Sequence, residues 1–261
     1  MQQAQDFLSE SEALYALVAS LPDQAFKRKT SFKDWTINTV IRHLHMWNWA
    51  ADLALEDRDA FKTFLGELRS NEGSLNEFEN NWVDGLSGQA LVQTWHEFFL
   101  EMAPRFGVAD PAKRVVWAGP DMSVRSSITA RLMETWAHGQ EIYDLLGVVR
   151  ENADRIRNIV VLGVNTYGWT FNVRGEQPPQ PMPHLRLTAP SGELWTFNDA
   201  STSELIEGLA EEFCQVVTQV RNIADVQLRI TGPNATDWMA KAQCFAGGPQ
   251  APPAPGTRKV Q

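Results

Sequence analysis

The sequence has few of the residues and segments that define several common protein classes. Its 261 residues include two cysteines, Cys214 and Cys244, which lie outside any C-x-x-C motif and are too few for a disulfide framework. No uncharged run reaches 18 residues, which argues against a membrane span. The N-terminus carries Gln, Asp and Glu where a signal peptide needs basic residues and then an apolar core. We therefore expect a cytoplasmic protein with reduced thiols.

Positive charge is also scarce. Lys and Arg number 23 against 32 Asp and Glu, a formal net charge of −9, and the basic residues do not cluster. Binding to nucleic acid is therefore not expected. The chain also lacks the HExxH, G-x-S-x-G and Gly-rich phosphate-loop motifs, so zinc proteases, α/β-hydrolases and nucleotide-binding proteins are without support. The expected partner is a small-molecule substrate, with neither nucleic acid nor membrane; monomer and homodimer both stay open.

Tryptophan, in contrast, is abundant. Seven of the ten tryptophans lie before residue 140. One interpretation is a large aromatic core, the usual environment of tryptophan. The other is an aromatic-walled pocket in the first half of the chain, with Trp47 and Trp136 among its walls.

The first half of the chain has the apolar periodicity of long helices. We predict four of them, over residues 3–20, 37–56, 89–104 and from Ser123 or Ser126 to Gly147. Thr36 is the expected cap of the second helix, and Gly147 the expected C-terminal glycine of the fourth. The polar stretch within 57–88 predicts a break between short helices. Four long helices joined by loops indicate a four-helix bundle over residues 1–150.

The second half changes character, so the fold class expected for the whole chain is α+β. A helix over 152–172 and the linker RGEQPPQPMPH precede HLRLTAPSGELWTF, which has the alternation and turn of a β-hairpin. A helix near 202–222, the strand VQLRITG and a helix near 234–246 follow. The pattern predicts a smaller domain over 151–247 with the order ββαβα. The Pro- and Gly-rich tail at 248–261 is expected to be disordered.

Three residues of the predicted bundle form a candidate metal site. Glu134 and His138 are four residues apart, so one helix places both on the same face. On another helix, His43 shares a stripe with Trp47 and is expected to face the interior. Two histidines and one carboxylate are a usual catalytic zinc set, and the facial triad of non-haem iron uses the same ligand types. The alternative for His43 is a core histidine bonded to a carbonyl group.

Two segments around these residues resemble a known family. A W-x7-H-L segment begins at Trp35, and an R-x2-E-x3-H segment begins at Arg131. Together they resemble the DinB-like superfamily and, more narrowly, the mycothiol-dependent maleylpyruvate isomerase family. The resemblance implies that His43, Glu134 and His138 bind a divalent metal ion, zinc first, with iron or nickel as alternatives. It also implies a low-molecular-weight thiol as a second cofactor.

The resemblance extends over nearly the whole chain. APSGELWTF, EGLAEEFCQVVTQVR and LRITGPNATDWMAKAQCFAG are similar to the family's smaller domain, which is of the sterol-carrier type. An arginine of that domain faces the cleft between the domains in the family, which makes Arg221 a candidate for binding substrate or thiol. Within the bundle, His45 is a candidate proton shuttle, and its alternative is a place at the surface or the pocket rim. Arg131 is a candidate for binding a substrate carboxylate, and its alternative is a salt bridge.

The expected function is a metal-dependent enzyme of the thiol-transferase or isomerase type. It would act on a small organic acid or conjugated carbonyl compound, in a cleft between the domains, with Glu134, His45 and Arg131 as catalytic residues. A metal-dependent hydrolase, lyase or cyclase using the same site is an alternative. A metal- or small-molecule-binding protein without turnover is another. A fully occupied four-ligand site would favour the binding protein, whereas an open ligand position would favour an enzyme.

Overall fold

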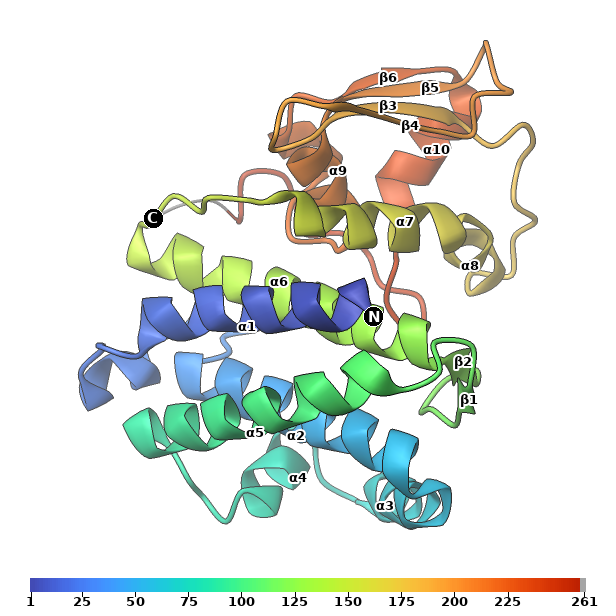
Figure 1. Ribbon diagram of the computed structural model, residues 1–261. Coiled ribbons are helices and arrows are strands. Elements are labelled where there is room, and N and C mark those ends of the chain that lie inside the picture. The colour runs from blue at the N-terminus through green and yellow to red at the C-terminus, as the bar shows by residue number, and fades with distance from the viewer. Residues whose placement is uncertain (259–261) are drawn as a thin grey trace. The chain divides into compact units, whose positions relative to one another are not determined.

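The computed structural model describes residues 1–258 and divides the chain into two compact units, Met1–Leu145 and Leu146–Gln261. The first unit consists almost entirely of helices, and the second combines helices with a sheet (Figure 1). This confirms the predicted α+β class. The sequence placed the division at residue 150, a few residues beyond the division found. Among the described residues, no helix has both the length and the apolar character that crossing a bilayer requires.

The first unit contains the four long helices that the sequence predicted. They are α1 (Gln2–Val18), α2 (Ile37–Glu56), α5 (Gly88–Val108) and α6 (Val124–Leu146). Helix α5 packs against both α1 and α2. The Thr36 side chain caps α2 by accepting a hydrogen bond from the Thr39 amide, as expected. Ser123 Oγ likewise accepts from the Ser126 amide at the start of α6, and Gly147 follows the helix with a φ of 68°.

The predicted end of the third helix near Pro104 was wrong, because α5 continues through this proline to Val108. A proline inside a helix removes one backbone donor, and the neighbouring hydrogen bonds can survive if packing holds the helix in place. Met102, Ala103 and Phe106 are all buried on either side of Pro104. Burial of these side chains therefore accounts for the continuation.

Two short helices, α3 (Arg58–Ser70) and α4 (Leu75–Trp82), lie between α2 and α5 in the sequence and pack against α2. Asp57 caps α3, and Ser74 forms a capping box with Glu77 at the start of α4. These caps explain why a polar stretch forms two helices with a break between them. A 3-10 turn, η1 (Asp23–Lys27), and the two-residue antiparallel pair β1 (Arg114–Val115) and β2 (Met122–Ser123) complete the unit.

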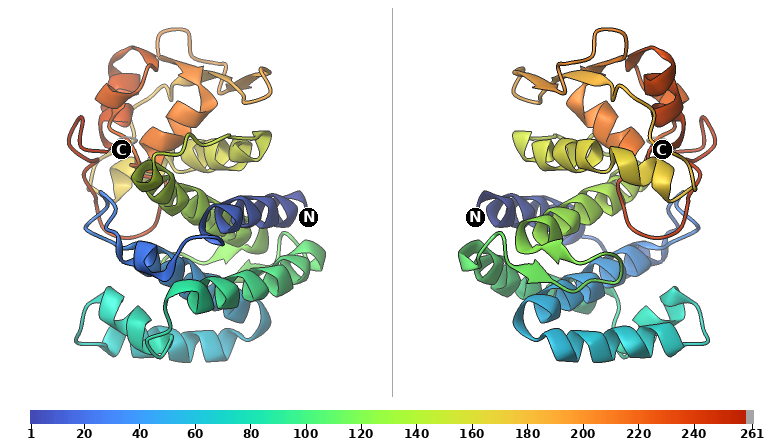
Figure 2. Two further views of the ribbon diagram at one scale, coloured as in Figure 1. Left: turned by 90° about the vertical axis from the view of Figure 1, so that its left-hand side faces the viewer. Right: turned by 90° about the vertical axis from the view of Figure 1, so that its right-hand side faces the viewer.

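The second unit holds a four-stranded sheet with helices over one of its faces (Figures 1 and 2). The strand order is β4-β3-β5-β6, and β3 pairs in parallel with β5 and antiparallel with β4. The strands are β3 (His184–Thr188), β4 (Leu194–Phe197), β5 (Leu205–Leu209) and β6 (Arg229–Thr231). The helices are η2 (Asp154–Ile156), α7 (Arg157–Asn165), α8 (Tyr167–Asn172), α9 (Ala210–Val217), η3 (Ile223–Asp225) and α10 (Pro233–Lys241).

The sequence predicted the β3–β4 hairpin but missed β5. Residues 205–209 were assigned to the start of a helix near 202–222, whereas they form a strand and the helix begins at Ala210. The physical reason is the pairing with β3, in which Ile206 lies opposite Leu185 and both are buried. A parallel pairing of this kind joins distant segments and leaves no local pattern. The predicted helix over 152–172 is similarly divided into α7 and α8 at Thr166.

The C-terminal tail does not follow the expectation of disorder over residues 248–258. The Gln219 side chain donates to the Gln250 carbonyl at 3.0 Å, and the Asn222 side chain donates to the Pro253 carbonyl at 2.8 Å. The Gly256 amide in turn donates to Asp225 at 2.8 Å. Prolines lack an amide donor but keep their carbonyl acceptors, so a Pro-rich segment can still be bound by side-chain amides. Residues 259–261 lie outside the described part of the chain.

Candidate metal centre

Helices α2 and α6 bring His43, Glu134 and His138 together in the first unit. Glu134 Oε2 lies 3.5 Å from His43 Nε2 and 3.2 Å from His138 Nε2. One ligand atom from each of the three residues lies within 4.8 Å of the others. The i, i+4 spacing on α6 sets one of these contacts, and the packing of the bundle supplies the other.

The spacing of these atoms suits a divalent metal ion. Ligand atoms about 2.1 Å from a tetrahedral zinc ion are roughly 3.4 Å from each other. The 3.5 Å and 3.2 Å separations agree with this value, and two imidazole nitrogens with one carboxylate oxygen are donors that zinc accepts. These three residues would therefore hold the ion and leave at least one position to water, thiol or substrate.

A fourth residue, Glu79 of α4, was not predicted from the sequence and contacts the other nitrogen of the His43 ring. His43 Nδ1 lies 2.7 Å from Glu79 Oε1, and the Trp47 indole donates to the same oxygen at 3.3 Å. Glu79 is fully buried, and its second oxygen, Oε2, has no hydrogen-bond partner among the described residues. In the sequence it belongs to a polar run, NEFENN, and nothing local distinguishes it from the solvated residues beside it.

The ionisable side chains of the cluster shift one another's pKa values. Burial alone would lower the pKa of His43, but the charge of Glu79 and hydrogen bonds to Glu134 and Glu79 raise it to about 9. Burial lowers the pKa of His138, and the hydrogen bond to Glu134 offsets only part of this effect. Burial would raise the pKa of Glu134, yet the two histidines and Arg131 hold it well below its usual range. A metal ion would have to displace the proton on His43 Nε2, so binding should weaken in acid.

Arg131 lies at the edge of this cluster and is almost completely buried. Its Nη2 atom is 4.0 Å from Glu134 Oε1, and its guanidinium group lies over the Trp117 ring at 5.5 Å. Its Nε and Nη1 atoms have no hydrogen-bond partner among the described residues. The salt bridge that the sequence offered as an alternative is thus present at the limit of contact. It leaves two donors of the guanidinium fork unused.

Aromatic rings surround the two histidine ligands. The Trp35 ring stacks on His138 at 5.3 Å between centroids and lies 5.1 Å from His43. The Phe32 ring meets His138 edge-on at 5.2 Å, and Trp47 lies 6.2 Å from His43. An aromatic wall was one of the two interpretations of the tryptophan content. Trp47 occupies such a position, whereas Trp136 is fully buried in the core.

The structure does not bring His45 to the metal cluster. Its ring packs against Trp82 at 5.3 Å and Phe98 at 5.5 Å, and its Nδ1 atom has no partner among the described residues. Burial lowers the pKa of His45 to about 4. His45 was a candidate proton shuttle, with a place at the surface or the pocket rim as the alternative. The structure corrects both, because His45 lies buried among aromatic rings. The cause is the position of His45 two residues beyond His43, about 200° around the helix.

Arg221, the candidate for binding substrate or thiol, belongs to the second unit. It follows α9 and is buried, and its Nη1 donates to the Val220 carbonyl at 3.2 Å. Cys214 and Cys244 are free and buried, and burial raises the pKa of the Cys214 thiol well above its usual value. The Cys214 thiol therefore lacks the thiolate character of a nucleophile.

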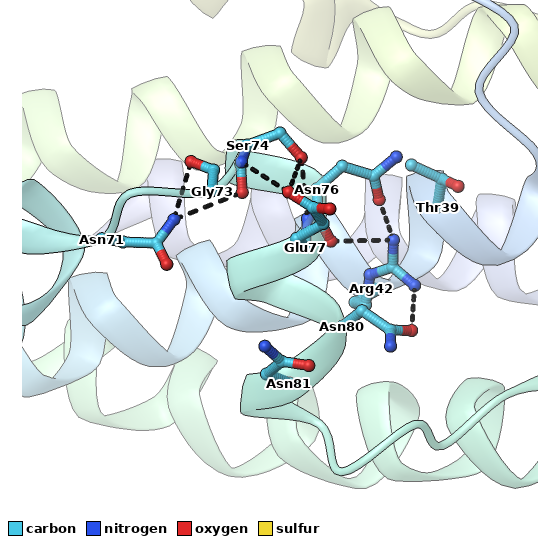
Figure 3. Close-up of a pocket in the computed structure, with 9 residues that line it drawn as sticks. All are labelled: Thr39, Arg42, Asn71, Gly73, Ser74, Asn76, Glu77, Asn80 and Asn81. Atoms are coloured by element: carbon cyan, nitrogen blue, oxygen red, sulfur yellow. Dashed lines mark hydrogen bonds between the residues drawn. The ribbon is translucent and has the colours of Figure 1, made fainter.

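An open polar pocket of about 670 Å³ lies on a different part of the first unit (Figure 3). Its lining includes none of the three metal-ligand candidates and consists of Thr39, Arg42, Asn71, Gly73, Ser74, Asn76, Glu77, Asn80 and Asn81. Arg42 Nη1 donates to Asn80 Oδ1 at 2.9 Å, and Nη2 donates to the Asn76 side chain. Arg42 thus links α2 to α4, the helix that carries Glu79.

Comparison with known proteins places this arrangement in a family. Residues 7–143 match the family model described as the mycothiol maleylpyruvate isomerase N-terminal domain. The chain belongs to this family. The matched segment contains all three ligand candidates and Glu79, and the resemblance inferred from the sequence is thereby confirmed.

Full-length relatives and solved structures extend the comparison. The chain is 33% identical to an uncharacterized protein of Mycobacterium tuberculosis, found in strains CDC 1551 / Oshkosh and H37Rv. The match runs over 244 residues, which are 94% of this chain and 95% of the relative. Crystal structures of the mycothiol-dependent maleylpyruvate isomerase and of a point mutant superpose with a TM-score of 0.54. They cover 82% of this chain and 87% of theirs at 14% and 13% identity. At that identity the likeness concerns the fold.

Proposed function

We propose that this protein is a divalent-metal-dependent enzyme of the isomerase type that acts on a small organic acid with the help of a low-molecular-weight thiol. The observation that carries the proposal is the trio His43, Glu134 and His138, in which Glu134 Oε2 lies at the spacing of zinc ligands from Nε2 of both histidines. Family membership supports the reaction class, because the solved neighbours are mycothiol-dependent isomerases. Zinc is the proposed metal and mycothiol the first thiol to test.

The donor set supports catalysis over storage of the metal. Structural zinc sites are closed by four protein ligands, whereas catalytic sites commonly have three and one open position. When bound, a divalent ion in such a position lowers the pKa of a coordinated thiol or water and polarises a carbonyl group. The chain's own residues hold the ion and, through the rings of Trp35, Phe32 and Trp47, provide an apolar surround.

Arg131 supplies the proposed specificity for acids. Its guanidinium group is buried near Glu134 and keeps two unused donors, Nε and Nη1. An unpaired buried donor is costly, and a carboxylate is the group that a guanidinium fork binds best. We therefore assign Arg131 to the carboxylate of the substrate.

The first test is metal content together with turnover. The purified protein should contain about one zinc ion per chain, in line with a single three-ligand site. A panel of α,β-unsaturated oxo acids, maleylpyruvate included, should show isomerisation that depends on mycothiol or another thiol. Glu134→Gln keeps the size of the side chain but removes the anionic ligand, so it should abolish turnover and leave the circular dichroism spectrum unchanged. Wild-type turnover in this variant would exclude Glu134 as a ligand.

The role of Arg131 is tested by comparing an acid substrate with its methyl ester. Arg131→Gln should raise KM for the acid roughly 10- to 100-fold, the equivalent of about 1.5–3 kcal/mol for a hydrogen bond to a charged group. KM for the ester, which lacks the charge, should rise much less, and the zinc content of the protein should not change. An equal rise in KM for acid and ester would show that Arg131 maintains the structure of the site and does not bind the carboxylate.

A further inference from the structure

Glu79 is a fully buried carboxylate whose place in the core calls for an explanation. Its Oε1 atom accepts hydrogen bonds from two side chains of α2, His43 at 2.7 Å and Trp47 at 3.3 Å. Its Oε2 atom is buried without a partner among the described residues. A buried carboxylate with an unsatisfied oxygen weakens a helical core that apolar side chains would fill better. The contact with His43 is therefore the feature to explain.

The hydrogen bond determines which nitrogen of His43 is free. A carboxylate only accepts hydrogen bonds, so His43 Nδ1, at 2.7 Å from Glu79, carries the hydrogen. The neutral ring then has its lone pair on Nε2. Nε2 is also the atom that lies 3.5 Å from Glu134 Oε2, on the side of the cluster where His138 lies. Glu79 thus fixes both the tautomer and the direction of the ring.

Helix α4 itself is held in place on both sides of Glu79. Arg42, the residue before His43, bonds to Asn76 and Asn80, which lie three residues before and one residue after Glu79 (Figure 3). Arg42 is itself almost buried, with 8% of its surface exposed. Neighbouring residues of α2 therefore bond to neighbouring residues of α4, and these contacts set the position of the Glu79 carboxylate.

We propose that Glu79 is a positioning residue of the metal centre, which holds His43 with Nδ1 protonated so that Nε2 binds the ion, and that Arg42 fastens α4 for this purpose. The inference rests on the proposed metal site and adds to it a second-layer carboxylate. Carboxylates that accept from the distal nitrogen of a metal-bound histidine orient the ring and make the ligand nitrogen more basic.

The test uses the full chain and two matched variants of α4, Glu79→Gln and Glu77→Gln. Glu77 lies two residues away on the same helix and takes part in the capping box, so its variant perturbs α4 without touching His43. Binding of Co²⁺ and Zn²⁺ is measured by competition with a chelator. Glu79→Gln should bind both ions roughly 10- to 100-fold more weakly. Glu77→Gln should bind them as wild type does.

A second readout reports directly on the histidine. With ¹⁵N-labelled histidine, the metal-free wild type should show a slowly exchanging hydrogen on His43 Nδ1. In Glu79→Gln this hydrogen should exchange faster, because an amide oxygen is a weaker acceptor than a carboxylate. The Co²⁺ absorption spectrum should also change in Glu79→Gln, because the imidazole is no longer held in one orientation. If Glu79→Gln does not fold, Glu79→Asp keeps the charge but is too short for the 2.7 Å contact, and the same losses are expected.

Three results would overturn the inference: equal affinity of wild type and Glu79→Gln, an equal loss in Glu77→Gln, or an unprotected His43 Nδ1 hydrogen in the wild type. Failure of the proposed function gives a different result. If the wild type binds neither ion, the proposed metal centre is wrong. The exchange of the Nδ1 hydrogen then still shows whether Glu79 holds His43.

Discussion

Two faces of helix α2 carry the same pair of residue types in very different surroundings. His43 and Trp47 lie four residues apart on one face, and His45 and Trp49 lie four residues apart on another. The first pair lies against a charged group, because both side chains form hydrogen bonds to the buried Glu79 carboxylate. The second pair meets aromatic rings, because both His45 and Trp49 pack against Trp82.

The comparison shows how strongly the surroundings decide the chemistry of a histidine. Both rings are buried, yet the pKa of His43 is raised to about 9 and that of His45 is lowered to about 4. Burial opposes the charge on each ring, and only His43 has carboxylates that reverse the effect. One face therefore offers a ligand nitrogen held by acceptors, and the other offers a neutral ring that serves packing.

The largest expected difference between the two faces concerns metal binding. His43→Leu removes one of three ligands and should lower Zn²⁺ affinity by more than about 100-fold. His45→Leu removes a ring that contacts no ligand and should leave affinity unchanged. Chelator competition on the purified variants measures both. Metal loss in His45→Leu, in a variant that retains the wild-type circular dichroism spectrum, would contradict the comparison.

The next largest difference concerns stability in acid. The folded-state pKa of His45, about 4, lies below the ordinary value of 6.5, so the unfolded chain takes up a proton first as the pH falls. Above pH 6.5, His45 therefore costs the protein no stability. As the pH falls from 6.5 to about 4, the free energy of unfolding decreases. Near pH 5 the loss should be about 2 kcal/mol.

Urea unfolding of metal-free protein near pH 7.5 and near pH 5 checks this expectation. His45→Leu has no group to protonate at this position, so its stability should fall less than that of the wild type between the two conditions. The protonation of His43 and the carboxylates is common to both proteins and cancels in the difference. An identical fall in both proteins would show that His45 is already accessible to protons in the folded state.

The smallest difference concerns the two tryptophans. Trp47→Phe removes the indole donor to Glu79 and should weaken Zn²⁺ binding roughly three- to tenfold, since the carboxylate loses one of its two fixed donors. Trp49→Phe should leave affinity unchanged and lower the free energy of unfolding by about 1–2 kcal/mol, because its ring packs against Phe64 and Trp82. The reverse assignment of effects would refute the division between the faces.

Much of the first unit could be predicted from local signals. The apolar period and the Thr36 cap locate α2, and Gly147 marks the end of α6. Glu134 and His138 could be paired because helix geometry alone brings residues four apart together. The second unit was harder to predict. Strand β5 owes its conformation to a parallel pairing with β3, a strand that is distant in the sequence.

Within the site, the sequence by itself determined the ligand types and one of the contacts between them. It provided His43 and the Glu134–His138 pair, and it placed His45 on a different side of the helix by periodicity. Tertiary structure decided that Glu79 sits behind His43, that Arg131 keeps two donors unused, and that His45 lies among aromatic rings. The reason is that helical periodicity fixes the direction of a side chain relative to its own helix. The charge, polarity and hydrogen bonds that it meets there come from segments tens of residues away, which only packing brings into contact.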